Sequence, residues 1–180
     1  MNRILFLVVS FLFLGCSQPT AGQSPTSEQS KADELKTEEL LIVEQDYDEA
    51  LKLAKKENKL VFIDCYADWC GPCKELDKLV FQDPARAQSL AKDFVLLKYN
   101  VMKDKQFNVG KKYHVCSYPT GLVLTNEGFL VNRKYGFPGE TADELAASVS
   151  SFAAESVQLN SQGKTLKGYS NSMEISEYPS

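Results

Sequence analysis

The sequence lacks several features that mark well-known protein classes. Its 180 residues include a single histidine, His114. The net charge of −4 argues against a nucleic-acid-binding protein, which needs a basic surface. The five cysteines are not distributed in pairs, so they do not form the disulfide framework of a small secreted domain. The long apolar run, residues 4–14, is too short to span a bilayer comfortably.

The sequence does contain enough apolar residues for one domain of ordinary size, since 43% of them are hydrophobic. The run Leu60–Tyr66 is apolar and rich in β-branched residues, which predicts a buried strand. Cys70-Gly71-Pro72-Cys73 follows and opens a segment that favours a helix. A strand that delivers two cysteines to the first turn of a helix indicates thiol–disulfide chemistry.

This spacing suits a redox pair because the thiolate is the reactive form of cysteine. A helix that begins at Gly71 directs unpaired N–H groups and its positive end toward Cys70, which favours the thiolate. Cys73 lies on the same helix face, close enough to resolve a mixed disulfide. Pro72 is tolerated because a first-turn N–H has no helical partner. We therefore expect Cys70 to be the nucleophile and Cys73 the resolving cysteine.

Metal binding is the alternative for a Cys-x-x-Cys pair. A zinc site needs a second pair of ligands at ordered spacing, and the candidates His114 and Cys116 are not spaced in that way. We expect no metal, and the redox interpretation implies no dissociable cofactor.

The residues around the dithiol resemble a known family. Ala67–Lys74 is similar to the active-site motif of thioredoxins. The wider pattern of Tyr66–Glu75 and Val80–Pro84 resembles the C-terminal periplasmic domain of the thiol:disulfide interchange protein DsbD. The resemblance covers residues 39–152. It implies an α/β protein of the thioredoxin fold, with a central mixed sheet flanked by helices.

The resemblance also implies roles for residues outside the motif. Asp64 matches a buried acid that transfers a proton to and from Cys73, and Lys98 matches the lysine that pairs with that acid and tunes it. A purely structural ion pair at the strand end is the alternative for Asp64. Tyr118 and Pro119 match a cis-proline loop that faces the cysteines.

Substrate binding is expected on the surface around the cysteines. Trp69 is interpreted as part of an apolar rim on which substrate proteins dock, with plain packing as the alternative. Gly71 and Pro72 complete this surface, and the backbone of Tyr118, beside Pro119, is placed to pair with an extended substrate segment.

The other two cysteines of the domain are open to more than one interpretation. Cys65 alternates away from Asp64 on the strand and is expected to be an inert core residue. Cys116 lies three residues before Pro119, near the expected active site. Cys116 could be a third redox thiol, and a disulfide between Cys65 and Cys116 is a further alternative.

The hydrophobic pattern and turn signals predict five strands and five helices, and from residue 60 onward, with helix 84–91 left aside, their order is β-α-β-α-β-β-α. The expected strands are 40–43, 60–66, 94–101, 120–126 and 129–135. The expected helices are one that Asp46 caps and that runs to 56, then 71–81, 84–91, 105–113, and a last one that Glu140 or Thr141 caps and that runs to about 154.

The two ends of the chain have different compositions from the domain. Residues 1–15 resemble a bacterial lipoprotein signal peptide, with lipid on Cys16, although an ordinary secretory peptide or an uncleaved anchor is the alternative. Residues 16–38 are expected to be a disordered tether, 39–155 the thioredoxin-like domain, and 156–180 a disordered polar tail. Ser17 favours the outer membrane over the inner membrane.

Together these patterns predict a lipid-anchored, monomeric thiol–disulfide oxidoreductase of the bacterial cell envelope that faces the periplasm. The Gly-Pro dipeptide resembles reducing family members, so protein disulfides are the expected substrates and a membrane electron donor of the DsbD type is the expected partner. An oxidase, an isomerase or a reductase for cytochrome c maturation is the alternative enzyme. A binding or holdase module without redox turnover is the alternative of another class.

Overall fold

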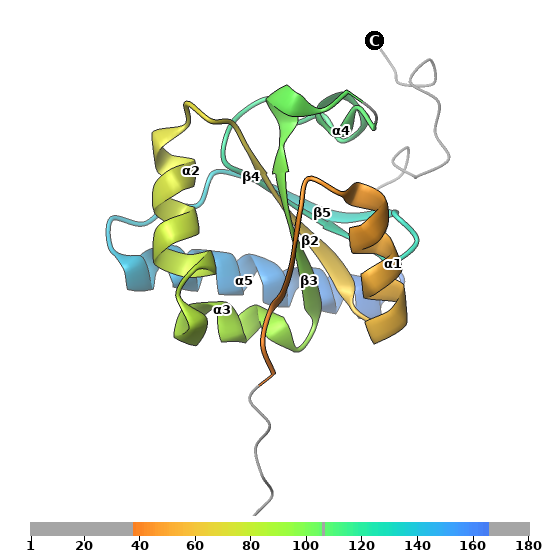
Figure 1. Ribbon diagram of the computed structural model, residues 1–180. Coiled ribbons are helices and arrows are strands. Elements are labelled where there is room, and N and C mark those ends of the chain that lie inside the picture. The colour runs from red at the N-terminus through yellow and green to blue at the C-terminus, as the bar shows by residue number, and fades with distance from the viewer. Residues whose placement is uncertain (1–37, 106, 166–180) are drawn as a thin grey trace, which may run out of the picture. The chain divides into compact units, whose positions relative to one another are not determined.

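A five-stranded mixed sheet forms the centre of the computed structural model, which describes residues 38–105 and 107–165 (Figure 1). The strand order is β1-β3-β2-β4-β5. The strands are β1 (Leu41–Glu44), β2 (Leu60–Tyr66), β3 (Phe94–Asn100), β4 (Thr120–Leu124) and β5 (Leu130–Tyr135). The helices are α1 (Tyr47–Glu57), α2 (Gly71–Leu76), α3 (Pro84–Ala91), α4 (Val109–Lys112) and α5 (Ala142–Ser161), with a π-helical turn η1 (Asp77–Phe81) and a 3-10 turn η2 (Val101–Lys103).

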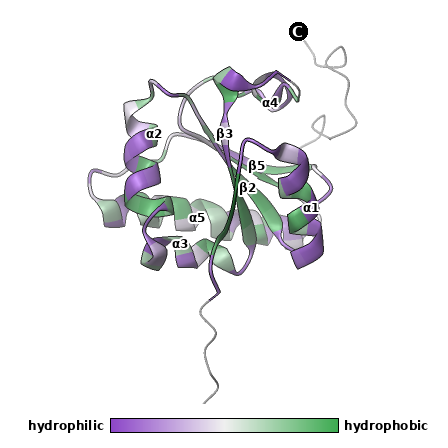
Figure 2. Ribbon diagram, in the orientation of Figure 1, coloured by the Kyte–Doolittle hydropathy of each residue, from purple (hydrophilic) through white to green (hydrophobic). Residues whose placement is uncertain are grey.

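The central strand β2 is buried on both faces of the sheet. It pairs in parallel with β3 and antiparallel with β4, so the sheet is mixed as predicted. Phe62 faces a core that α2, η1, α3 and α5 cover, whereas Val61 and Ile63 face a second core under α1 and α4. This explains why every position of the strand except Asp64 is apolar, because both faces of the strand exclude water. Figure 2 shows the hydrophobic character of these central strands and the mixed character of α1.

Side-chain caps set the helix boundaries close to where the sequence predicts them. The carboxylate of Asp46 accepts a hydrogen bond from the Glu49 amide at the start of α1, and Asn58 ends that helix in the left-handed conformation. Asp83 caps α3 in the same way. Thr141 and Glu144 form a reciprocal capping box on α5.

Three predicted helices differ in the structure. The helix predicted over 71–81 is an α-helix only as far as Leu76, and the π-helical turn η1 continues it to Phe81. Residues 105–113 are not one helix, because α4 spans only Val109–Lys112. The carboxylate of Asp104 accepts hydrogen bonds from the backbone amides of Phe107 and Val109, and Asn108 is left-handed, so this segment forms a turn first.

Helix α5 continues to Ser161 rather than ending near Ala154. The prediction of a disordered tail from residue 156 is therefore wrong for residues 156–161. Ser156 is fully buried in the domain. Its hydroxyl donates a hydrogen bond to the Phe152 carbonyl at 2.7 Å, which satisfies this polar side chain.

The predictions for the ends of the chain fall largely outside the described residues. The expected signal peptide, Cys16 and almost all of the tether lie within residues 1–37, and most of the expected tail lies within 166–180. Among residues 38–105 and 107–165, no helix has both the length and the apolar character needed to cross a membrane.

Candidate active site

Cys70 and Cys73 lie where the C-terminal end of β2 passes into α2, and they form a disulfide bond. The Cys70 sulfur accepts a hydrogen bond from the Cys73 amide at 3.2 Å, so this side chain caps α2. The two cysteines expose only 3% and 2% of their surfaces. The spacing argument predicted this arrangement, and it places the sulfur of Cys70 at the positive end of the helical segment.

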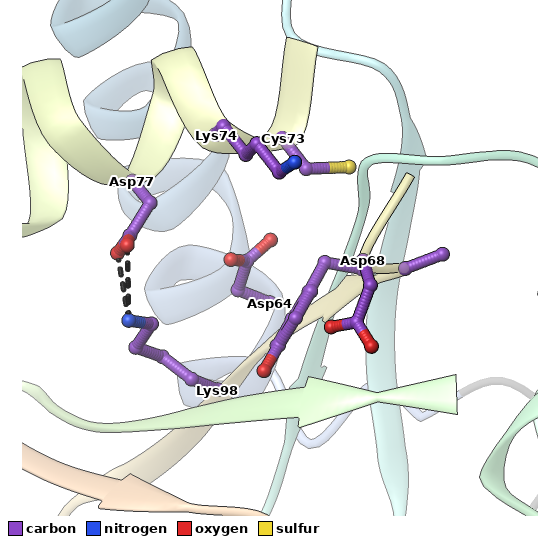
Figure 3. Close-up of a pocket in the computed structure, with 8 residues that line it drawn as sticks. Asp64, Asp68, Cys73, Lys74, Asp77 and Lys98 are labelled. Carbon is purple, nitrogen blue, oxygen red and sulfur yellow. Dashed lines mark hydrogen bonds and ion pairs between the residues drawn. The ribbon is translucent and has the colours of Figure 1, made fainter. Parts of the chain in front are cut away.

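A pocket of about 120 Å³ lies directly beneath Cys73 (Figure 3). Its lining is unusually rich in charged side chains for so small a space. It consists of Asp64, Tyr66, Ala67, Asp68, Cys73, Lys74, Asp77 and Lys98. Because the pocket connects a buried acid with a reactive sulfur, it is suited to proton transfer.

Asp64 is the acid at the floor of this pocket. It is 1% exposed, and its Oδ1 atom has no hydrogen-bond partner. Burial, together with the nearby negative charge of Asp77, raises its pKa from 3.8 to about 7, while the charge of Lys98 acts in the opposite direction. A carboxyl group that titrates near neutral pH exchanges protons readily under physiological conditions.

Lys98 does not form the direct ion pair with Asp64 that the resemblance implied. The two residues are register partners on β3 and β2, but the Lys98 ammonium binds Asp77 at 3.0 Å and Glu44 at 3.6 Å. The long lysine side chain reaches past its neighbour toward η1, as Figure 3 shows. Lys98 therefore acts on Asp64 through its charge, across the pocket, and not through a hydrogen bond.

Asp77 is the residue of this site that the sequence interpretation missed. It lies four residues after Cys73, and side chains at this spacing share one face of a helix. This spacing in the sequence could have identified Asp77 as a neighbour of the dithiol. Its carboxylate holds Lys98 and faces Asp64, so it contributes directly to the electrostatics of the pocket.

We predict that Asp77 and Lys98 shift the pKa of Asp64 in opposite directions. Asp77→Asn removes a negative charge and should lower this pKa, whereas Lys98→Met removes a positive charge and should raise it. Carbon NMR of the Asp64 carboxyl group across pH 4–9 in the oxidised protein measures both shifts. Glu44→Gln is the control, because it removes an exposed acid that also contacts Lys98. Shifts of the same sign in the two pocket variants would contradict this description.

The rim of the site is apolar and includes the expected cis-proline. The Tyr118–Pro119 peptide bond is cis. Tyr118 packs against the buried cluster of Ala67, Cys70 and Cys73, and its ring meets that of Trp69 edge to face with centroids 5.8 Å apart. Trp69 is 71% exposed, while Gly71 and Pro72 are exposed at the start of α2. Plain core packing of Trp69 is therefore excluded, and its role in substrate binding stays a prediction.

The two other cysteines in the described residues are free thiols. Cys65 is fully buried, and burial raises the pKa of its thiol well above the ordinary value, which agrees with an inert core residue. Cys116 is exposed. The alternative of a Cys65–Cys116 disulfide is not what the structure contains. Within the described ranges, no group of three or more His, Cys, Asp or Glu side chains is placed to hold a metal ion.

Comparisons with known proteins agree with this geometry. Residues 42–125 match the family model described as thioredoxin-like. The thiol:disulfide interchange protein DsbD of Vibrio vulnificus is 41% identical over 80 residues, which cover 44% of this chain and 13% of that protein. The DsbD protein of Escherichia coli K12 is 40% identical over 78 residues, covering 42% and 14%. The chain thus spans about an eighth of the length of these relatives.

Two solved structures extend the comparison to most of the domain. A protein of Bacteroides thetaiotaomicron, named a disulphide-isomerase, is 39% identical with a TM-score of 0.53, and the match covers 67% of this chain and 97% of that one. A thioredoxin of Thermus thermophilus is 22% identical with a TM-score of 0.55, covering 70% and 94%, and shows the same fold. A family with this dithiol carries thiol–disulfide oxidoreductase activity in general. The chain belongs to the thioredoxin-like family.

Proposed function

We propose that this protein is a protein-disulfide reductase that uses Cys70 and Cys73 as a two-electron donor. The observation that carries the proposal is the buried Asp64, with a pKa of about 7, in the pocket beneath Cys73. A reductase must deprotonate its second cysteine after the first has been captured by the substrate. A carboxyl group that titrates near neutral pH at this position meets that requirement.

In the proposed reaction the Cys70 thiolate attacks one sulfur of a substrate disulfide. The substrate disulfide breaks, one substrate sulfur leaves as a thiolate that takes up a proton, and a mixed disulfide to Cys70 forms. Asp64 then accepts the proton of Cys73, whose thiolate attacks the Cys70 sulfur. The second substrate thiol is released and the Cys70–Cys73 disulfide forms, so two electrons pass from the enzyme to the substrate. The structure corresponds to this oxidised product.

An isomerase is the second candidate, because the Bacteroides protein of 39% identity is named a disulphide-isomerase. The two activities separate in a paired assay of the wild-type protein. A reductase is expected to accelerate insulin reduction by a chemical thiol donor severalfold and to add little to the reactivation of scrambled ribonuclease. An isomerase gives the reverse.

The reduction potential provides a second measurement of the same question. A value near −270 mV is typical of a reducing thioredoxin, whereas a value near −120 mV indicates an oxidase. We expect the former. A potential near −120 mV together with no acceleration of insulin reduction would contradict the proposed direction.

We also infer a place in the cell envelope. The proposal rests on the lipoprotein-like pattern of residues 1–15 with Cys16, and on the partial similarity to DsbD proteins. A reductase in that compartment needs a continuous supply of electrons, because the enzyme leaves each turnover oxidised. A membrane donor of the DsbD type is the partner that would supply them, and disulfide-bonded proteins are the substrates. The expected monomeric state remains a prediction.

A further inference from the structure

A second exposed apolar side chain lies close to the dithiol, and the sequence interpretation did not use it. Met102 is in η2, the turn that follows β3, and it exposes 65% of its surface. Together with Trp69, it is one of two side chains with the largest exposure among the large hydrophobic residues of the described ranges. Apolar side chains that gather on a surface commonly mark an interaction site.

Tyr118 connects Met102 to the reacting sulfurs. Its hydroxyl lies 3.9 Å from the sulfur of Met102, its ring meets Trp69, and its side chain packs against the cluster that contains Cys70 and Cys73. Trp69, Tyr118 and Met102 therefore form one continuous surface beside the dithiol, which we call the Met102 patch. The patch therefore lies beside the cysteine with which a substrate disulfide would react.

The position of Met102 is fixed by hydrogen bonds of the backbone and of neighbouring side chains. The side-chain oxygen of Asn100 accepts a hydrogen bond from the Met102 amide at 3.0 Å, and its side-chain nitrogen donates to Asp68 at 2.8 Å. Lys103 forms an ion pair with Asp68 at 2.9 Å. These contacts tie η2 to the loop that carries Trp69. The methionine is therefore presented at a defined place relative to the cysteines.

We propose that Met102 is a specificity-determining residue that receives an apolar side chain of the substrate next to its reacting cystine. The proposal rests on the proposed reductase function. The three side chains of the patch offer thioether and aromatic surface, which gains free energy by covering an aliphatic or aromatic group and gains little from a polar one. A flexible methionine also adapts to side chains of different shape.

The test compares two synthetic peptide disulfides that differ at one position. Leu or Gln stands beside the reacting cysteine, so that size and charge are matched. The wild-type protein is expected to reduce the Leu peptide with a kcat/KM about tenfold higher, at the lower end of the discrimination that one apolar side chain allows. Met102→Gln should reduce this ratio about fivefold, and Met102→Leu should restore it because it replaces the lost apolar surface.

Ile42→Gln is the matched control. Ile42 is also an exposed large apolar residue, at 46%, but it lies on the edge strand β1 and outside the Met102 patch. It should leave the ratio unchanged. An equal ratio in the wild type and in Met102→Gln, or an equal loss in Ile42→Gln, overturns this inference and leaves the proposed function intact. A wild-type protein that reduces neither peptide overturns the proposed function and this inference with it.

Discussion

Asp64→Asn is expected to make the oxidised domain more stable at pH 8 and to slow its reduction of substrates. In the wild type, burial raises the pKa of Asp64 to about 7 in the folded state, compared with 3.8 for an exposed carboxyl group. Between these values the unfolded chain releases a proton that the folded chain retains. The free energy of unfolding of the wild type therefore falls as the pH rises from about 4 to about 7.

The size of this effect follows from the gap between the two pKa values. It corresponds to about 4 kcal/mol at pH 8, since each tenfold change in proton affinity is worth about 1.4 kcal/mol. At pH 3 the carboxyl group is protonated in both states, and this contribution is absent. Urea unfolding of the oxidised wild type and of Asp64→Asn at pH 3 and pH 8 measures the difference. The stability gap between the two proteins should widen by several kcal/mol across this range.

The same substitution removes the proton acceptor proposed for Cys73. General acid–base catalysis contributes on the order of 10²–10⁴-fold, so the resolving step should slow by at least about 10²-fold at pH 7. Asp68→Asn is the matched control, because it changes the same residue type at the same pocket but at an exposed carboxylate. A stability gap that does not depend on pH would show that Asp64 is already ionised in the folded protein at acidic pH.

Cys73→Ala is expected to convert the enzyme into a trap for its substrates. Cys70 still attacks a substrate disulfide, but no second thiol is present to release the mixed disulfide. Complexes should therefore accumulate in cells and disappear on treatment with a reducing agent. Non-reducing gel electrophoresis and mass spectrometry detect and identify them. Insulin reduction by the purified variant should fall to the rate of the chemical donor alone.

The exposed Cys116 makes a control necessary for this experiment. The trap is best built in a Cys116→Ser background, so that each complex reports on Cys70. The double variant Cys70→Ala, Cys73→Ala in the same background should give no complexes. Complexes that persist in it would show that another thiol captures the partners. A membrane electron donor among the trapped proteins would support the proposed place in the envelope.

The dithiol and its surroundings were predictable because local sequence determines them. Six of the seven positions of β2 are apolar, and Pro72 with the Cys-x-x-Cys spacing defines the start of α2. Asp46 and Asp83 cap their helices by accepting hydrogen bonds from backbone amides within the next three residues. Interactions of this short range are present in the sequence itself, without knowledge of the tertiary structure.

The features that the sequence did not predict are those in which a side chain or backbone segment has more than one available interaction partner. Lys98 has three carboxylates near it, and register places it beside Asp64, yet its ammonium binds Asp77 and Glu44. Residues 105–113 have a helical pattern, but Asp104 supplies an alternative hydrogen-bond acceptor that favours a turn. The stretch from Ser156 onward is polar in composition, but α5 continues to Ser161 and its residues Val157 and Leu159 pack against the core. In each case a tertiary or side-chain contact decides between local alternatives.

The direction of β1 has a practical consequence for handling this protein. β1 runs parallel to β3 with Leu41 beside Val95 and Glu44 beside Lys98, so it begins at the N-terminal end of β3. The cysteines follow the opposite end of the sheet, beyond the Tyr66–Asn100 pair. A chromatography resin or sensor chip coupled just ahead of Glu38 would therefore be attached at the pole remote from the dithiol. When the protein is immobilised in this way, its dithiol remains accessible from solution.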